Sequence, residues 1–246
     1  MKLLRSSLIT APHGFTSRGG GVSTGPFAAL NLSAATGDDP ELVAENRRRV
    51  LGVFGDPPLA RLDQVHGTVV HIVSGPGVRE GDGLLSAEPG LLLAVSVADC
   101  YPLLLEEPGA GAVAALHAGW RGVLGNILAV AVERMEAAFA AAPERLRLAV
   151  GPGIAADSYQ VGEDLAARFA DAGYEAAVLP DPEPGRARLD LPAVIRRQAL
   201  DLGIPLQHIE FAGLDTYTHP ELFSYRRDGS KSGRMWGLIQ LPPFAG

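Results

Sequence analysis

Three residues of this sequence have side chains that bind metal ions well. They are His66, Cys100 and His117, and Cys100 is the only cysteine in the chain. A thiolate and two imidazoles form a donor set that suits Zn²⁺, and three protein ligands leave one coordination position open for water or substrate. Cysteine is also a common buried hydrophobic residue, so the residue types alone leave a packing role open. As a set, the three residues predict a catalytic zinc site rather than a structural one.

Several arginines are candidate anion-binding groups. Arg18 precedes three consecutive glycines, Arg121 follows a tryptophan, and Arg226 stands next to another arginine. Guanidinium groups pair with phosphate oxygens in a bidentate manner, whereas an isolated surface arginine is simply solvated. We therefore expect some of these side chains to hold a small anion, with solvated surface arginines as the alternative.

The candidate metal ligands stand at the ends of apolar runs that have the length of strands. Residues 91–97 lead to Cys100, and residues 112–116 lead directly to His117. His66 comes just before a third run, in which apolar and polar residues alternate loosely. Because neighbouring strands end at a common edge of a sheet, we expect the three side chains to meet at one edge.

Two longer segments have the apolar spacing and the end signals of helices. Asp39 and Pro40 start a helix that runs to about Phe54, and a second helix is expected over residues 123–142. Asn46 falls within the apolar stripe of the first helix, where a buried amide must find hydrogen-bond partners. It either ties down a neighbouring loop or contacts a substrate. Strand-like runs alternate irregularly with helices, which predicts mixed sheets covered by helices.

Size and composition set the broad class of the chain. Its residues, 1–246, fit one domain, and 47% of them are hydrophobic against 20% charged. No run is apolar for the length that a membrane span needs, and a net charge of −7 argues against binding to nucleic acid. A single cysteine allows no disulfide within the chain. We therefore expect a cytoplasmic protein without membrane or nucleic-acid partners, and we favour a monomer.

Two specific motifs stand in order along the chain, Ala98-Asp99-Cys100 and His117-Ala118-Gly119-Trp120-Arg121-Gly122. Further short motifs lie in residues 15–23, 30–32, 45–47, 64–67, 151–154 with Tyr159, and 223–227. Together these motifs resemble those of the YfiH-like family, whose members are labelled polyphenol oxidase (laccase), purine nucleoside phosphorylase or peptidoglycan editing factor. The resemblance implies an α+β fold, an α/β/β/α sandwich of two mixed sheets with helices outside. It also implies that His66, Cys100 and His117 bind zinc.

The resemblance further implies an enzyme, a purine nucleoside phosphorylase with adenosine deaminase activity. Its substrates would be phosphate and a purine nucleoside such as adenosine, inosine or methylthioadenosine. Zinc would activate water for the hydrolytic deamination of adenosine, and Asp99 is the candidate either for the proton transfer or for orienting a ligand histidine. Cys100, Asp99 and Arg121 form the predicted catalytic group, and Arg18, Asn46 and Arg226 are the predicted substrate-binding residues.

Other functions remain open from the sequence. Cys100 as a nucleophile with His117 as its base would give a Cys-His hydrolase acting on peptidoglycan precursors. Copper in place of zinc would give a laccase-like polyphenol oxidase, although the six histidines include no His-X-His pair. A metal-stabilised binding module without turnover is a third alternative. The chain also lacks a second cysteine that many relatives carry near residues 213–217, which puts any role of that thiol in doubt.

Overall fold

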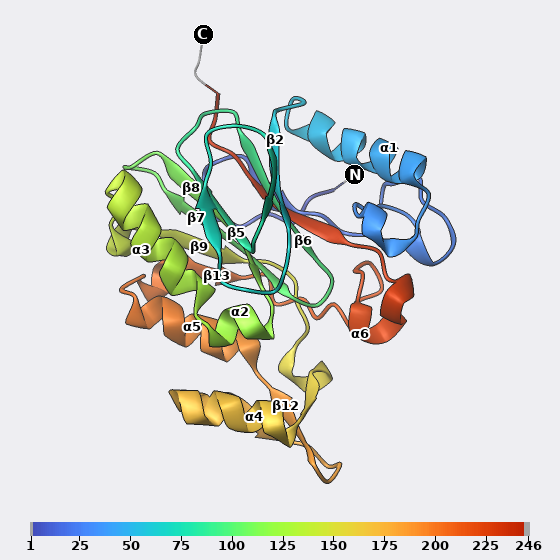
Figure 1. Cartoon of the computed structure of the whole chain (residues 1–246), viewed down its shortest axis with the longest axis vertical. Helices are drawn as coiled ribbons and strands as arrows, with labels where there is room; N and C mark the ends of the chain where they lie inside the picture. Colours follow the sequence, from blue (N-terminus) through green and yellow to red (C-terminus); the bar gives the residue numbers. More distant parts are fainter. Residues whose placement is uncertain (1, 244–246) are drawn as a thin grey trace.

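Two β-sheets packed against each other form the centre of the molecule (Figure 1). The computed structural model describes residues 2–243. The first sheet has five strands in the order β1 (His13–Phe15), β14 (Met235–Ile239), β6 (Leu92–Val97), β2 (Leu59–Asp63) and β4 (Gly77–Glu80). The second has six strands in the order β13 (Ile209–Phe211), β9 (Arg147–Val150), β7 (Tyr101–Glu107), β8 (Ala112–Ala118), β5 (Gly83–Ser86) and β3 (Val70–Ile72).

Helices cover the outer face of each large sheet. Helix α1 (Pro40–Val53) lies on the first sheet, and helices α2 (Trp120–Leu124), α3 (Ile127–Phe139) and α5 (Leu191–Asp201) lie on the second. At the lower end of Figure 1, helix α4 (Glu163–Phe169) packs beside a small sheet of β10 (Gln160–Gly162), β12 (Arg186–Leu189) and β11 (Val178–Pro180). The short helix α6 (Tyr225–Asp228) precedes β14. This arrangement confirms the predicted α/β/β/α sandwich.

Side chains of the central strands alternate between two hydrophobic layers. In β6, Leu93 and Val95 face the layer between the two sheets, whereas Leu92 and Ala94 pack toward α1. This follows from the strand period of two, which sends successive side chains to opposite faces. Burying a leucine completely is worth about 1.5–3 kcal/mol, so these strands are stabilised on both faces.

The two predicted helices have different outcomes. The first is confirmed, because α1 begins at Pro40 and the Asp39 carboxylate accepts a hydrogen bond from the Glu41 backbone N–H. The second prediction was wrong in its continuity, since residues 123–142 hold the end of α2 and a separate helix α3. Asn126 breaks the helix with a φ of 54° and caps α3 by accepting from the Ala129 backbone N–H.

Three connections carry the chain from the first sheet to the second at the same end of the sandwich. They join β2 to β3, β4 to β5 and β6 to β7. The three strands before the crossings run parallel to one another, as β2 pairs in parallel with both β4 and β6. Strand β8 runs antiparallel to β5 and β7 and therefore ends at this same edge. Any polar residue in these connections is thus brought to a single place.

Within residues 2–243, no helix has both the length and the apolar character required to cross a lipid bilayer.

Candidate metal centre and substrate pocket

The three predicted metal ligands meet at the end of the sandwich where the chain crosses between its sheets. His66 lies in the β2–β3 connection, Cys100 ends the β6–β7 connection, and His117 belongs to the end of β8. One ligand atom from each residue lies within 4.8 Å of the other two. The imidazole rings of His66 and His117 stand edge to face, with centroids 4.8 Å apart. The common strand edge expected from the sequence is therefore present.

Strand pairing fixes the distance between Cys100 and the segment after His117. Tyr101 of β7 pairs with Ala118 of β8, which places Cys100 opposite Gly119. A Cβ atom on Gly119 would lie 3.0 Å from the Cys100 Sγ and 3.3 Å from the His66 ring. Glycine is needed there because a side chain would enter the space where the ligand atoms converge.

Asp82, in the β4–β5 connection, holds both histidines and was missed by the sequence reasoning. Its fully buried carboxylate contacts the His117 Nδ1 at 2.8 Å and accepts hydrogen bonds from the backbone N–H groups of His66 and Gly67. The His66 backbone has a φ of 59°, a left-handed conformation that the two bonds to Asp82 stabilise. The only signal in the sequence is an aspartate between two glycines before an apolar run.

Electrostatics favour the metal-binding form of the cysteine. Burial alone would raise the pKa of the Cys100 thiol, but the adjacent His117 and His66 outweigh it and lower that pKa to about 6. Burial opposes protonation of His117, yet Cys100 and Asp82 raise the pKa of its imidazole to about 9. The thiolate is the form of cysteine that binds metals and acts as a nucleophile. Without metal, the geometry therefore holds a thiolate beside an imidazolium.

A pocket of about 790 Å³ opens beside the three ligand residues, a size typical of small-molecule sites. Four arginines and two aspartates line it, so its charged residues carry a positive excess although the whole chain is acidic. The arginines are Arg47, Arg61, Arg226 and Arg234, and the aspartates are Asp63 and Asp99. Leu32, Ile154, Trp236 and two tyrosines add apolar and aromatic walls.

Three of the four pocket arginines were not singled out from the sequence. Burial lowers the pKa of Arg47, and the neighbouring guanidinium of Arg61 lowers it further. Arg47 donates to the Leu32 carbonyl oxygen, and Arg234 donates to the carbonyl oxygens of Ser232 and Gly233. Arg61 makes no hydrogen bond or ion pair within the described residues. Of these three arginines, only Arg61 has a pattern in the sequence that hints at its place. It alternates with buried residues in β2 and so shares one face of that strand with Asp63.

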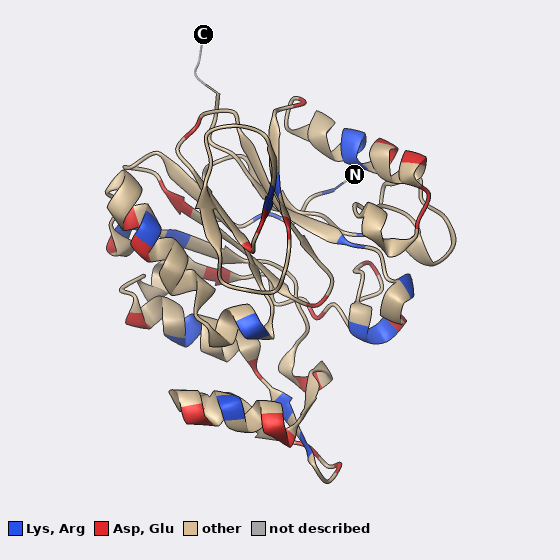
Figure 2. Cartoon of the chain, in the orientation of Figure 1, with Lys and Arg blue, Asp and Glu red and all other residues tan. Residues whose placement is uncertain are grey.

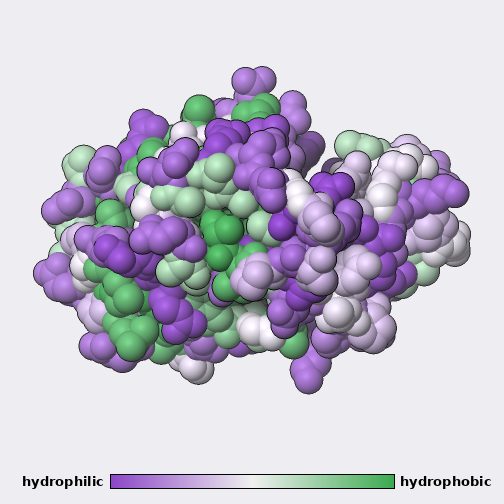
Figure 3. Space-filling model, turned by 90° about the horizontal axis from the view of Figure 1, so that it is seen from below, coloured by the Kyte–Doolittle hydropathy of each residue, from purple (hydrophilic) through white to green (hydrophobic). Residues whose placement is uncertain are grey.

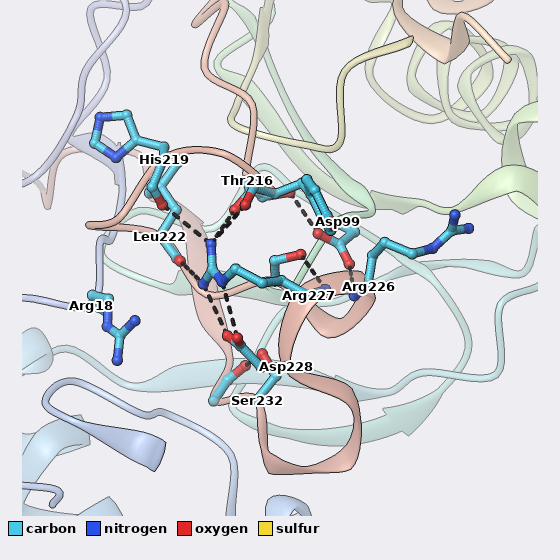
Figure 4. A network of polar contacts seen from close by, with 12 residues as sticks. Arg18, Asp99, Thr216, His219, Leu222, Arg226, Arg227, Asp228 and Ser232 are labelled. Atoms are coloured by element: carbon cyan, nitrogen blue, oxygen red, sulfur yellow. Dashed lines mark hydrogen bonds and ion pairs between the residues drawn. The ribbon is translucent and has the colours of Figure 1, made fainter. Parts of the chain in front are cut away.

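Asp99 and Arg226, both predicted from the sequence, line this pocket. Asp99 Oδ1 accepts a hydrogen bond from the Thr216 hydroxyl, and Oδ2 accepts one from the Arg226 backbone N–H, both at 2.6 Å (Figure 4). The Arg226 guanidinium donates to the Gln160 carbonyl oxygen and lies 5.2 Å from the centre of the Tyr159 ring. Asp99 thus fixes the start of α6 and with it the position of Arg226.

Arg227, next to Arg226, organises the loop that precedes α6. Its guanidinium donates to several backbone carbonyl oxygens and to the Asp228 carboxylate (Figure 4). The carbonyls belong to Thr216, Tyr217, His219 and Leu222. The planar guanidinium thus spends its hydrogen-bond donors on contacts within the protein. Arg227 therefore acts as a structural clamp behind the pocket.

The other three predicted residues are not among those that line the pocket. Asn46 is fully buried under a loop, where it accepts from the Val22 backbone N–H and donates to Ser23 Oγ and two carbonyl oxygens. Arg18 donates to the Ala28 carbonyl oxygen and lies over the Phe223 ring, apart from the hydrogen bonds drawn in Figure 4. Arg121 is exposed and stacks over Trp120. Substrate contacts of these three residues stay predictions.

Together, the fold and the site define a class: a two-sheet sandwich with one candidate metal centre where the chain crosses between the sheets. The chain belongs to the family described as "Multi-copper polyphenol oxidoreductase laccase", whose model matches residues 12–242. Within residues 2–243, only the His66, Cys100 and His117 group has three such side chains close enough to hold an ion. The donor set thus fits one metal ion better than the several that the family description names.

Similar proteins carry a different description. The chain is 47% identical over 244 residues to a purine nucleoside phosphorylase of Deinococcus radiodurans, covering 98% of this chain and 94% of that protein. It is 37% identical to a purine nucleoside phosphorylase of Corynebacterium glutamicum, with 94% of each chain covered.

Solved structures agree with the fold. YlmD of Geobacillus stearothermophilus matches with a TM-score of 0.88 at 31% identity, covering 98% of each chain. The YfiH protein of Bacillus licheniformis matches with a TM-score of 0.86 at 31% identity over 93% of this chain and 92% of that one. The resemblance to the YfiH-like family is therefore confirmed.

Proposed function

We propose that this protein is a zinc-dependent purine nucleoside phosphorylase. The observation that carries the proposal is the His66, Cys100 and His117 group in the wall of a pocket with excess arginine, in a chain closely related to proteins of that name. Phosphorolysis needs a site for phosphate, a site for the nucleoside and stabilisation of the departing purine. Each requirement finds candidate groups in this pocket.

Zinc fits the donor set. Two imidazoles and a thiolate match its preferences, and three protein ligands leave a position open. The Asp82 carboxylate at the His117 Nδ1 leaves Nε2 as the metal-facing atom, an outer contact that zinc-binding histidines commonly have. Zinc bound there supplies a Lewis acid that polarises a substrate oxygen or activates water. The protein's contribution is to hold the three donors and to shape the pocket around them.

The pocket arginines are the proposed phosphate-binding groups. Arg61 has no hydrogen-bond or ion-pair partner within residues 2–243, and its guanidinium lies close enough to that of Arg47 to contribute to the lowered pKa of Arg47. An anion between them would relieve this repulsion and accept bidentate hydrogen bonds. Arg226, already predicted from the sequence, approaches from the other wall. The phosphate-binding roles predicted for Arg18 and Arg121 from the sequence remain part of the proposal.

Aromatic residues are the proposed contacts of the purine. Trp236, Tyr159 and Tyr225 line the pocket, and Tyr225 is 53% exposed. A ring at the pocket rim can stack on a base without a large loss of side-chain entropy. Burial raises the pKa of Tyr159 to about 12, and the Cys100 thiolate contributes, so the hydroxyl stays protonated and can donate a hydrogen bond. These features support a flat, polar-edged ligand such as a nucleoside.

Deamination of adenosine is the proposed second activity of the same site. It requires water and a proton carrier, and Asp99 is the nearest sequence-predicted candidate. Both oxygens of Asp99 already accept hydrogen bonds, which supports a positioning role for it more strongly than proton transfer. An Asp99→Asn protein that deaminates adenosine at a near-normal rate would support positioning alone.

The remaining alternatives differ in the state of Cys100. A thiolate paired with an imidazolium supports a Cys-His hydrolase if the site is metal-free, and copper at the site would support a polyphenol oxidase. Alkylation of Cys100 separates the metal-free hydrolase from the alternatives in which a metal binds the thiolate. Zinc-bound thiolate should resist iodoacetamide, whereas the thiolate of a cysteine hydrolase should react at once.

Product analysis tests the proposed function. Inosine incubated with the zinc-loaded protein should yield hypoxanthine and ribose 1-phosphate only when phosphate is present. Arg61→Gln should raise the KM for phosphate about tenfold or more, because a charge-assisted hydrogen bond is worth about 1.5–3 kcal/mol. Arg48→Gln, an exposed change on α1 outside the pocket, is the matched control. Hypoxanthine release that ignores phosphate would refute phosphorolysis.

A further inference from the structure

A second groove, of about 490 Å³, lies next to the metal pocket. Its walls come from α2, β10 and the residue before it, α4, β12 and α6, and include Trp120, Tyr159, Asp164, Arg168, Arg186 and Arg226. Tyr159 and Arg226 also line the metal pocket, so these two side chains form the boundary between the cavities. The groove contains none of the three candidate metal ligands.

Charge is the distinguishing feature of this groove. Three guanidinium groups line it, from Arg168, Arg186 and Arg226, against the single carboxylate of Asp164. In Figure 2, basic positions on α4 and β12 lie at the lower end of the molecule together with acidic positions on α4, and the basic positions of α2 and α6 lie above them. Seen from below in Figure 3, the same end carries hydrophilic surface interrupted by several hydrophobic groups. A chain with a net charge of −7 thus keeps a local positive excess here.

The guanidinium groups are held in place, and within the described residues only that of Arg186 forms an ion pair, with Glu183. Within the described part of the chain, Arg168 forms no ion pair, and its guanidinium lies 5.0 Å from the centre of the Trp120 ring. The Arg186 Nε lies 3.6 Å from Glu183, and Arg226 uses one nitrogen on a carbonyl oxygen. By contrast Arg188, two residues beyond Arg186, lies within 4 Å of both Asp181 and Asp157. The groove arginines therefore retain free donors for a ligand.

From this arrangement we propose that the groove is an anion-binding site for a chain of two or three phosphoryl groups. The three guanidinium groups that line the groove match the charge on adjacent phosphoryl groups better than that of a single carboxylate ligand. The volume exceeds the needs of one inorganic phosphate and accommodates a chain of two or three. Arg226 lines both pockets, so the proposal rests chiefly on Arg168 and Arg186, which line the groove alone, and does not depend on the proposed function of the metal pocket.

Binding of inorganic tripolyphosphate, followed by calorimetry at low ionic strength, tests this site. The wild-type protein should bind it, and both Arg168→Gln and Arg186→Gln should weaken binding about tenfold, the effect of losing one charge-assisted contact. Arg48→Gln, an equally exposed change on α1, should leave the affinity unchanged. The affinity should fall as salt is added, because the guanidinium groups are solvent-exposed.

Two further variants separate the groove from the metal pocket. Cys100→Ser protein, in which metal chelation by tripolyphosphate should play no part, should still bind it through Arg168 and Arg186. Arg61→Gln should retain binding, because Arg61 lines only the other pocket. Loss of binding in Arg61→Gln with no effect of Arg168→Gln would overturn the proposal, and so would the absence of binding to the wild-type protein. Either result leaves the test of phosphorolysis unaffected.

Discussion

Asp82 is the side chain that contacts the most parts of the candidate metal centre. It is fully buried, yet its carboxylate has three partners, the His117 ring and the backbone N–H groups of His66 and Gly67. Burial would raise the pKa of Asp82, but these hydrogen bonds outweigh it and lower that pKa, so the carboxylate stays charged. Asp82 therefore orients the imidazole ring of His117 and fixes the backbone of His66.

Replacing Asp82 by asparagine should weaken zinc binding about 10- to 100-fold, the usual effect of losing an outer carboxylate contact. The side chain keeps its shape but loses the charge that orients the His117 imidazole. Competition with a chromophoric chelator measures the affinity, and Asp171→Asn, an exposed change outside both pockets, is the control. Equal zinc affinities of the Asp82→Asn and wild-type proteins would show that Asp82 only stabilises the backbone of the β2–β3 connection.

Helix α1 and the loop it covers show how a polar residue can be structural within an apolar face. Asn46 lies beside Val43 and Val50, the other buried residues of the helix. It satisfies backbone groups of the loop, including the Ala29 and Asn31 carbonyl oxygens and the Val22 N–H. The sequence pattern located this residue and left two roles open, and the contacts support the loop-binding one.

Asn46→Ala should destabilise the protein by about 2–3 kcal/mol, because it leaves several buried polar groups without partners. Urea unfolding measures the change, and Arg48→Ala on the exposed face of α1 should shift it by less than about 0.5 kcal/mol. Turnover per folded molecule should stay near that of the wild type at low temperature. A large loss of turnover at full stability would instead support the predicted substrate contact.

The position of the candidate metal ligands at strand ends could be predicted from the sequence. The residues around them, such as Asp82 and Arg61, could not. The apolar runs that precede Cys100 and His117 correspond to β6 and β8, since burial imposes a recognisable pattern. Asp82 and Arg61 give no comparable signal, because their roles arise only when three crossings converge at one edge. The break between α2 and α3 was missed because helical spacing continues across Gly125 and Asn126, whose local conformation ends the helix.

The N-terminal segment joins the two sheets on the side away from the helices of the second sheet. Ser6 and Ser7 donate to the Glu210 carboxylate of β13, and Thr10 and Ala11 donate to Glu106 of β7. The segment then enters the first sheet at His13 in β1. The ring of His13 contacts the Ala11 carbonyl oxygen at Nδ1 and accepts the Ser6 N–H at Nε2, so it is neutral in this arrangement.

Stability should therefore fall in mild acid through His13. Burial, the largest cause, lowers the pKa of His13 below its ordinary value of 6.5, so the unfolded chain binds the proton more readily than the folded one. The contribution is present above pH 6.5 and is lost as the pH falls from there through the folded pKa. Thermal unfolding of His13→Gln compared with wild type, over that window, should show a smaller decrease in Tm for the variant. Parallel curves for the two proteins would rule His13 out as the cause.

The most direct test of the account measures metal content and phosphorolysis on the same preparations. Protein purified without added metal should hold about one zinc per chain, and inosine phosphorolysis should rise in proportion to zinc occupancy on reconstitution. Cys100→Ser should lose both zinc and phosphate-dependent turnover while keeping the fold. Full phosphorolysis by a metal-free protein, or stoichiometric zinc retained by Cys100→Ser, would contradict the central claim that His66, Cys100 and His117 form the metal centre of a nucleoside phosphorylase.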